Sequence, residues 1–260
     1  MAPLPHVVSR LRAACLANNP TTRPGLDRGP PRKARCAGCR LIPSHCLCAL
    51  RPTVSTRAAM CLVMAEFEPL KPSNTGWLIA DVVPQTFAFG WSRLAVDPAL
   101  LALLADPQWQ PYVVFPGEFA QPGRVVTELP PPAPDARPGR RPLFVLLDGT
   151  WSEARKIFRK SPYLDGYPVL SLQPGQLSRY RLRQSWHEHH ICTSEVAALC
   201  LALAGDQHAA QTLEAWLDVF SDRYLRARQS VAPDVGDRVH QRLRLLAQGG
   251  ENGMAPPVSR

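Results

Sequence analysis

The chain lacks the sequence signatures of several large enzyme classes. It has no G-x-G-x-x-G, no Walker-type G-x-x-x-x-G-K and no G-x-S-x-G elbow, so neither dinucleotide, nucleoside-triphosphate nor serine-hydrolase chemistry is indicated. It also lacks internal repeats, an apolar run of membrane-spanning length, and a secretory apolar segment, because Arg10 and Arg12 interrupt the N-terminal stretch. We therefore expect a soluble, cytoplasmic protein without a membrane partner, and nothing indicates an obligate protein partner.

Acidic residues are scarce compared with basic ones. The 260 residues include 30 Lys and Arg against 21 Asp and Glu, a net charge of +9, while 45% hydrophobic residues suffice for a folded core. Basic residues crowd the first forty positions, where Asp27 is the only acid. Clustered arginine attracts phosphate, so this region, including Arg35 and Arg40, predicts nucleic-acid contact, with ordinary surface charge as the alternative. For Arg223, Arg226 and Arg228 we favour ordinary surface charge.

Four cysteines fall within thirteen residues, in the segment C-A-G-C-R-L-I-P-S-H-C-L-C. Cys36 and Cys39 form a C-x-x-C pair, and Cys46 and Cys48 form a C-x-C pair. Four thiolates suffice for a tetrahedral structural zinc site, which we favour over free thiols or a redox pair. The remaining cysteines include three in apolar runs, as expected of buried thiols in a reducing compartment.

Apolar strand-like runs alternate with helix-like runs after this segment. The expected strands are residues 58–64, 86–91, 112–115, 143–147 and 169–172, and the expected helices are residues 76–83, 98–105, 152–159, 193–203 and 211–228. Such alternation predicts an α/β fold, a mostly parallel sheet with helices on both faces. Residues 121–141 are rich in proline and glycine and are expected to form a loop.

Ligands of such sheets bind at the carboxyl ends of the strands. The loops expected there are Phe115–Glu118, Asp148–Trp151 and Ser171–Gly175, together with the helix start at Thr193–Glu195. Asp148 follows the most apolar strand and is either a helix N-cap or a catalytic group, and Trp151 either stacks on a base or packs in the core. The H-E-H-H run at residues 187–190 is expected to be a polar surface turn, not a metal site.

Several motifs in combination resemble the DTW-domain family of tRNA-uridine aminocarboxypropyltransferases. They are the cysteine segment, S-N-T-G-W-L at 73–78, F-P-G-E at 115–118, L-L-D-G-T-W at 146–151, L-S-x-Y-R-L-R at 177–183 and C-T-S-E-V-A at 192–197. The resemblance covers residues from about 35 to about 228. Many relatives carry His-Pro after the first strand, where this chain has Ala65-Glu66, with Glu68 at the family's acidic position.

The resemblance implies a Rossmann-like fold related to SPOUT methyltransferases, preceded by a small zinc knuckle. It also implies transfer of the 3-amino-3-carboxypropyl group of S-adenosylmethionine to N3 of a tRNA uridine, in the variable loop, with release of methylthioadenosine. The domains expected on this basis are a flexible basic tail (1–35), the zinc knuckle (36–50), the catalytic domain (51–232), and a C-terminal helix and tail (233–260).

Residue roles follow from the resemblance and from the chemistry of N3 alkylation. Asp148 is the expected base, with Thr150 and Trp151 as catalytic neighbours. The expected S-adenosylmethionine contacts are Phe115, Pro116, Gly117, Glu118, Gly149, Ser171, Leu172, Thr193, Ser194 and Glu195. The expected tRNA contacts are Arg35, Arg40, Arg179, Arg181 and Arg183. The alternatives are a methyltransferase that uses the same donor, and a non-catalytic RNA-binding protein.

Overall fold

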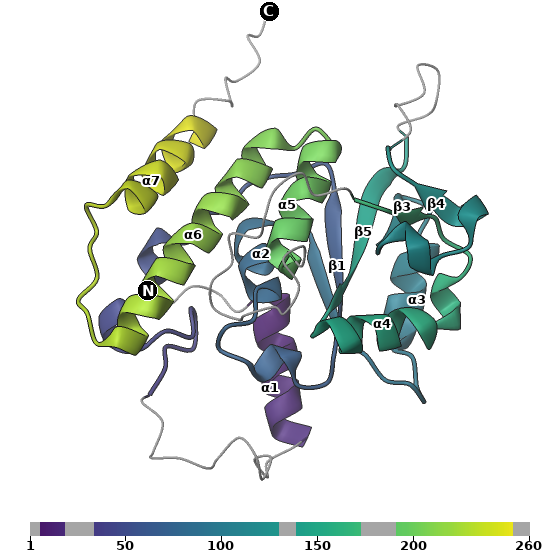
Figure 1. Cartoon of the computed structure of the whole chain (residues 1–260), viewed down its shortest axis with the longest axis horizontal. Helices are drawn as coiled ribbons and strands as arrows, with labels where there is room; N and C mark the ends of the chain where they lie inside the picture. The colour runs from purple at the N-terminus through teal and green to yellow at the C-terminus, as the bar shows by residue number, and fades with distance from the viewer. Residues whose placement is uncertain (1–5, 19–33, 130–138, 173–190, 252–260) are drawn as a thin grey trace, which may run out of the picture.

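The computed structural model describes residues 6–18, 34–129, 139–172 and 191–251, and these form one six-stranded sheet flanked by helices (Figure 1). The strand order is β2-β1-β5-β3-β6-β4, and every neighbouring pair is parallel. The strands are β1 (Ala59–Met64), β2 (Thr86–Gly90), β3 (Trp109–Val114), β4 (Val125–Val126), β5 (Arg141–Asp148) and β6 (Val169–Leu170). The expected mostly parallel α/β fold is confirmed.

Alternate residues of the buried strands serve two separate cores, as the pleat requires. In β1, Met60, Leu62 and Met64 face one core, while Ala59, Cys61 and Val63 face the other. The first core is covered by α2 (Gly76–Val82), α5 (Thr193–Leu203) and α6 (Gln207–Gln229). The second is covered by α3 (Pro98–Ala105) and α4 (Trp151–Arg159), and Figure 1 shows the two sets of helices on opposite sides of the sheet.

Local sequence sets the helix starts. Asp97 caps α3, because its side chain accepts a hydrogen bond from the Ala99 amide, and Pro98 follows at the first helical position. Thr150 caps α4 through a capping box with Glu153. Asp148 is therefore not the cap of α4. No helix within the described ranges is long and apolar enough to cross a membrane.

Two expectations about irregular segments are wrong. The N-terminal segment was expected to be a flexible tail, but residues Val7–Asn18 form helix α1, whose Val8 is fully buried against α2 and neighbouring elements. Within the expected loop at 121–141, β4 pairs with β6 and extends the sheet. Both elements depend on partners distant in sequence, and neither has a marked local pattern. The C-terminal helix is α7 (Arg238–Glu251), which packs on α6.

The cysteine segment is docked on the first core beside α2 and α6. It contains two short 3-10 helices, Pro43–His45 and Cys48–Leu50. The indole nitrogen of Trp77 donates to the Gly38 carbonyl at 3.0 Å, and the Nε2 atom of His45 lies 2.8 Å from the Val231 carbonyl oxygen. The segment is therefore fixed to the helical layer of the main domain.

Candidate functional site

The four cysteine thiols converge on one point. All four sulfur atoms of Cys36, Cys39, Cys46 and Cys48 lie within 4.8 Å of one another. The sulfur–sulfur distances are 3.5 Å for Cys36–Cys48, 3.7 Å for Cys39–Cys46 and 3.7 Å for Cys36–Cys46. A tetrahedron with zinc–sulfur bonds of about 2.3 Å has edges of about 3.8 Å. The thiols therefore fit a structural zinc ion, as the spacing predicted.

Hydrogen bonds favour the thiolate form of Cys36 within this cluster. Burial raises the pKa of Cys36, but hydrogen bonds from the amides of Cys39 and Gly38 and from the thiols of Cys48 and Cys46 together outweigh it and lower that pKa to about 7. The Leu47 amide donates to the Cys39 sulfur at 3.4 Å, although burial still raises the pKa of Cys39 to about 11. A bound zinc ion would hold all four sulfurs as thiolates and close the knuckle.

A buried polar network lies at the carboxyl edge of β1 and β5. Asp148, at the end of β5, is 2% exposed, and both of its carboxylate oxygens accept hydrogen bonds. The Thr193 hydroxyl donates to Oδ1 at 2.5 Å, and the Asn74 amide donates to Oδ2 at 2.7 Å. Asp148 thus joins β5 to the starts of α5 and α2.

Asn74 extends this network to a second buried acid. Its Nδ2 also lies 3.2 Å from Oε1 of Glu68, which is 1% exposed and pairs with Lys71. Its Oδ1 accepts from the Trp77 amide at 2.9 Å. A Cβ atom at Gly76 would stand 2.7 Å from Oδ2 of Asp148, so only glycine allows this approach.

The loops after β3 and β6 form a second group beside Asp148. The Gly117 amide donates to the Ser171 hydroxyl at 2.9 Å, and a Cβ atom at Gly117 would meet both Val125 and Ser171. Pro116 is half-buried and Glu118 is exposed. Because β3 lies next to β5, the F-P-G-E loop and Asp148 share one edge of the sheet.

Aromatic rings connect the two groups. Trp151, the first residue of α4, stacks on Phe115 with ring centroids 5.3 Å apart and an interplanar angle of 9°. Phe158 stacks on Phe115 at 4.4 Å, and Phe119 meets Trp151 edge-on at 5.7 Å. Trp151 is half-buried, so of the two roles expected for it, packing is the one these contacts display.

The other expected site residues have structural contacts of their own. Glu195 accepts from the Cys192 amide at 2.7 Å, and Thr150 bonds to Glu153. Gly149 is tightly placed, since a Cβ atom there would lie 3.0 Å from the Cβ of Glu153. Ser194 is 1% exposed, and its hydroxyl has no hydrogen-bond partner in the part of the chain that is described. Leu172 packs on the first core.

The expected RNA contacts separate into three cases. Arg35 is exposed and lies 5.6 Å from the Tyr224 ring centroid. Arg40 is 3% exposed, lies 4.3 Å from the Trp77 ring centroid, and donates to the Asn74 carbonyl at 3.0 Å. The expectation that Arg40 contacts RNA is therefore wrong, because its guanidinium is enclosed between helices. Residues 179–183, with their three arginines, and the histidine run at 187–190 lie outside the described residues.

Sequence reasoning missed Asn74, Lys71 and Glu68 as site residues. Asn74 was present in the S-N-T-G-W-L motif, and Glu68 at an acidic position of the family pattern, but neither had a local signal for its partners. Lys71 and Asn74 meet the carboxylate of Glu68 within six residues, but the second carboxylate that Asn74 reaches, that of Asp148, lies 74 positions away along the chain. Only the adjacency of β1 and β5 brings these groups together.

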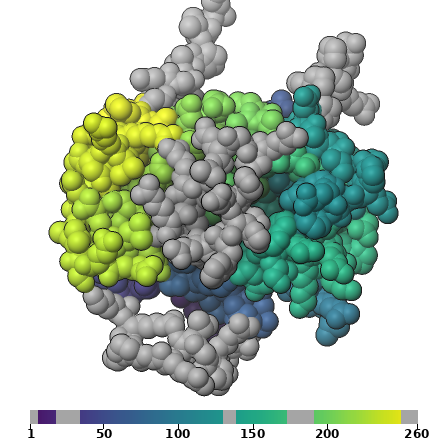
Figure 2. All heavy atoms as spheres, viewed as in Figure 1, coloured from purple at the N-terminus to yellow at the C-terminus, as the bar shows by residue number. Residues whose placement is uncertain are grey.

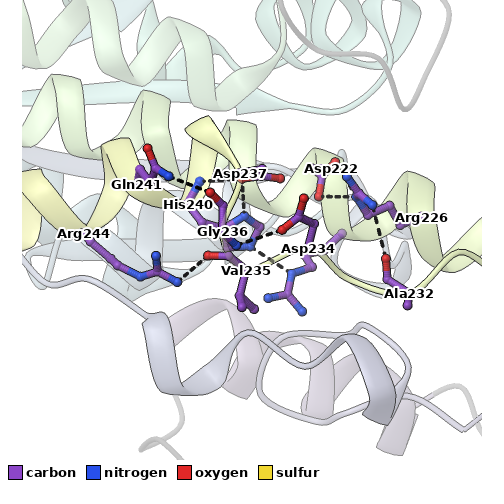
Figure 3. Close-up of polar contacts among 11 residues, drawn as sticks. Asp222, Arg226, Ala232, Asp234, Val235, Gly236, Asp237, His240, Gln241 and Arg244 are labelled. Atoms are coloured by element: carbon purple, nitrogen blue, oxygen red, sulfur yellow. Dashed lines mark hydrogen bonds and ion pairs between the residues drawn. The ribbon is translucent and has the colours of Figure 1, made fainter.

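A second group of possible metal ligands, Asp222, Asp237 and His240, is already engaged in hydrogen bonds (Figure 3). His240 Nδ1 lies 2.7 Å from Asp237, and Arg223 donates to His240 Nε2 at 2.9 Å. Asp222 is paired with Arg226 at 2.9 Å. Both imidazole nitrogens are engaged and arginines surround the acids, so this group joins α6 to α7 and does not form a cation site.

A cavity of about 210 Å³ lies on this same flank, between α7 and the segment that follows the cysteines. Its lining includes Arg51, His240 and Arg244. It is therefore remote from the carboxyl edge. The chain between Leu172 and Ile191, which joins β6 to α5, lies outside the described residues.

A family model described as the DTW domain matches residues 33–225. The match spans the cysteine cluster, the F-P-G-E loop, and the network around Asp148. It ends before α7 and begins after α1. No solved structure matches the chain.

Proposed function

Because the chain belongs to the DTW-domain family, which is linked to tRNA modification, we propose that it is a tRNA-uridine aminocarboxypropyltransferase. The single observation that carries this proposal is the family match over 33–225, which includes the carboxyl-edge network of Glu68, Asn74, Asp148 and Thr193. The donor would be S-adenosylmethionine and the acceptor N3 of a tRNA uridine.

The reaction balances without an additional reagent. S-adenosylmethionine supplies an activated carbon next to its sulfonium, and N3 forms a bond to the γ-carbon of the aminocarboxypropyl group. The γ-carbon–sulfur bond breaks, sulfur keeps the electron pair, and neutral methylthioadenosine leaves. The N3 proton passes to a base. Because the methyl group is bonded to the same sulfur, the position of the donor in the site decides which group is transferred.

The residues at the carboxyl edge suit this donor in chemical type. Gly117 and Gly149 have no room for a Cβ atom beside neighbouring side chains, and this close packing fixes the two loops that would line the donor site. The exposed carboxylate of Glu118 can attract the donor's ammonium group. The half-buried ring of Trp151 provides apolar surface of the kind that adenine rings require.

The contacts of Asp148 favour a positioning role over the base expected from the sequence. Both of its oxygens are occupied, by Thr193 and Asn74, and 2% exposure leaves no oxygen facing a substrate. A base must reach the proton that it removes. We therefore propose that Asp148 positions the starts of α2 and α5 around the donor, and that proton removal falls to another group at this edge.

The pH–rate profile separates these two roles. In Asp148→Asn, we expect kcat to fall at every pH while the profile keeps the wild-type shape, because the new amide group faces two donors and shifts the site. Loss of the limb of the profile that corresponds to a deprotonated base would instead assign proton removal to Asp148. Thr193→Ser, which keeps the hydroxyl donor, is the matched control and should retain most activity.

Isotope-labelled donor tests the overall reaction. Purified protein, tRNA and S-adenosylmethionine labelled either in the methyl group or in the methionine backbone are combined, and the nucleosides are analysed by mass spectrometry. We expect the backbone label in a uridine heavier by one aminocarboxypropyl group. Transfer of the methyl label would establish a methyltransferase, and transfer of neither label, with tRNA still bound, would leave a non-catalytic RNA-binding protein.

A further inference from the structure

Helix α4 has an outer face composed almost entirely of cations. Arg155, Lys156, Arg159 and Lys160, at the helix and its C-cap, are all exposed, whereas Ala154, Ile157 and Phe158 are buried in the second core. Positions three to four residues apart share one side of a helix, so the four cations form a single stripe. We name these four residues the α4 stripe.

Nothing within the described ranges neutralises this stripe. None of its four members forms an ion pair with an acid in residues 6–18, 34–129, 139–172 or 191–251. The single acid of α4, Glu153, bonds to Thr150 and lies 3.9 Å from Lys71. Like charges four residues apart weaken a helix by about 0.2–0.5 kcal/mol per pair. The helix dipole favours the cations in the last turn of α4, so the fold tolerates the stripe, and its positive charge is left to face an external polyanion.

The connection from β2 to α3 extends the cationic surface. Trp91 anchors it to the end of α4, because its indole nitrogen donates to the Ser161 hydroxyl at 2.9 Å and its ring lies 5.5 Å from Lys156 Nζ. Arg93 is exposed, and the adjacent Leu94 is 95% exposed. The segment leading into α3 projects below α4 at the lower right (Figures 1 and 2).

The stripe begins next to the proposed site. Helix α4 starts at Trp151, three residues after Asp148. With a rise of about 1.5 Å per residue, positions 155 to 160 lie about 6–14 Å along the helix axis from Trp151. A nucleic acid that follows the stripe would therefore have its backbone beside the edge where its base must react.

We propose that the α4 stripe, together with Arg93, binds the sugar–phosphate backbone of the tRNA and sets its orientation at the carboxyl edge. This inference rests on the proposed function for the identity of the RNA. Exposed Arg and Lys side chains bind phosphates and do not distinguish base sequence. The α4 stripe would therefore position the tRNA, and the residues of the carboxyl edge would select the uridine.

The salt dependence of tRNA binding tests the proposal. We compare Arg159→Gln/Lys160→Gln with Arg228→Gln/Arg238→Gln, which removes the same charge from exposed cations on α6 and α7. Each lost phosphate contact lowers the slope of log affinity against log salt by about 0.7–0.9. In Arg159→Gln/Lys160→Gln, the α4 variant, we expect the magnitude of this slope to fall by about 1.4–1.8. It should fall further when Arg155 and Lys156 are also changed to Gln, and it should not change in Arg228→Gln/Arg238→Gln, the α6–α7 variant.

Two further measurements separate charge from fold and binding from catalysis. Arg159→Lys/Lys160→Arg keeps the charge and should keep the wild-type slope. In labelled-donor assays, the α4 variant should raise the KM for tRNA while kcat and the KM for S-adenosylmethionine stay unchanged. If the α4 variant loses salt slope while the wild-type protein transfers no group to tRNA, the α4 stripe still binds RNA and the proposed function is refuted. A wild-type slope in the α4 variant, or a slope lost instead in the α6–α7 variant, would overturn this inference.

Discussion

On α6 and α7, several arginines bind partners within the protein, whereas on α4 the cations face outward without acidic partners among the described residues. Arg226 pairs with Asp222, Arg223 donates to His240, and Arg242 lies 2.9 Å from Glu214. Figure 2 shows this α6–α7 flank on the side of the molecule opposite to α4. Arginines of α6 and α7 thus have acidic residues near enough to pair with, whereas the cations of α4 have none among the described residues.

The knuckle belongs to the internally bonded flank. Arg40 lies between the rings of Trp77 and Phe220, at 4.3 and 5.3 Å from their centroids, and His45 meets the Val231 carbonyl oxygen just after α6. The same flank therefore carries the four-cysteine cluster and the arginine network. The opposite flank carries the helix that leads from the Asp148 loop.

Loss of zinc should reduce stability more than any other change predicted for this protein. Its effect should be confined to the flank formed by the cysteine segment, α6 and α7. We expect about one zinc per chain, which is lost in Cys46→Ser but retained in the control Cys15→Ser on α1. Structural zinc contributes about 10–16 kcal/mol in small peptides, comparable with the stability of a whole domain. Hydrogen exchange should accelerate in α6 and leave α4 protected. Undiminished zinc in Cys46→Ser, or equal acceleration in both helices, would contradict the prediction.

Arg223→Met tests whether the α6–α7 arginines are structural. Arg223 is 4% exposed, and its removal leaves Nε2 of the fully buried His240 without its donor. We expect a loss of about 1–3 kcal/mol in unfolding free energy. Arg228→Met, an exposed change on the same helix, should cost less than about 0.5 kcal/mol. Chemical denaturation measures both, and equal effects would remove the distinction between paired and free cations.

The interior of this flank also holds two titrating groups with opposite pH effects. Burial raises the pKa of Asp81 to about 7, against a hydrogen bond from Trp216 and the charges of Arg40 and Arg51. Burial, together with Arg40 and Arg51, lowers the pKa of His6 to about 3. His6 Nε2 lies 3.5 Å from Asp81 Oδ1.

Their contributions to stability should cancel between about pH 4 and 6.5. The Asp81 contribution is present below its unfolded pKa of 3.8 and is lost as pH rises through 7. The His6 contribution is present above its unfolded pKa of 6.5 and is lost as pH falls toward 3. In His6→Phe, unfolding free energy relative to wild type should fall with rising pH, by up to about 1.4 kcal/mol per unit.

Asp81→Asn should show the reverse trend, with stability relative to wild type rising with pH over the same range. Urea unfolding at pH 4.5, 5.5 and 6.5 measures all three proteins under one protocol. Parallel stability curves for wild type and both variants would show that neither group titrates as its burial requires.

Arg93→Gln, a change beside α4, should have the smallest effect of the predicted changes, and this effect is on tRNA binding. One lost phosphate contact lowers the salt slope of tRNA binding by about 1 and leaves the free energy of unfolding unchanged. The control is Arg57→Gln, an exposed change at the amino end of β1, the opposite edge of the sheet. A salt slope that responds to Arg57 but not to Arg93 would place the RNA elsewhere.

Most of the sheet could be predicted from sequence because its strands are locally distinctive. Residues 143–147 are continuously apolar, and Asp97-Pro98 marks the start of α3 with two independent signals. Helix α1 and strand β4 could not be predicted. Residues 7–18 have no clear apolar period and form a helix because Val8 packs in the first core, while the two residues of β4 are defined by pairing with β6.

For the site, residue types were easier to predict than contacts. The four cysteines, Asp148 and the F-P-G-E loop were all identified from their spacing or from the motifs that contain them. The burial of Arg40 and the two hydrogen bonds to Asp148 were not, because their partners lie 34 to 74 positions away along the chain. No local pattern records such partners.

The sequence by itself determined the cysteine cluster that fits a zinc ion, the alternation of strands with helices, and the family. Those properties depend on residue identity at short spacing, which folding does not alter. Only the tertiary structure decided which arginines are enclosed, which are paired and which face solvent, and that Asp148 holds Asn74 and Thr193. Charge pairing and burial arise where elements distant in sequence pack together, so strand order and helix placement, not composition, set them.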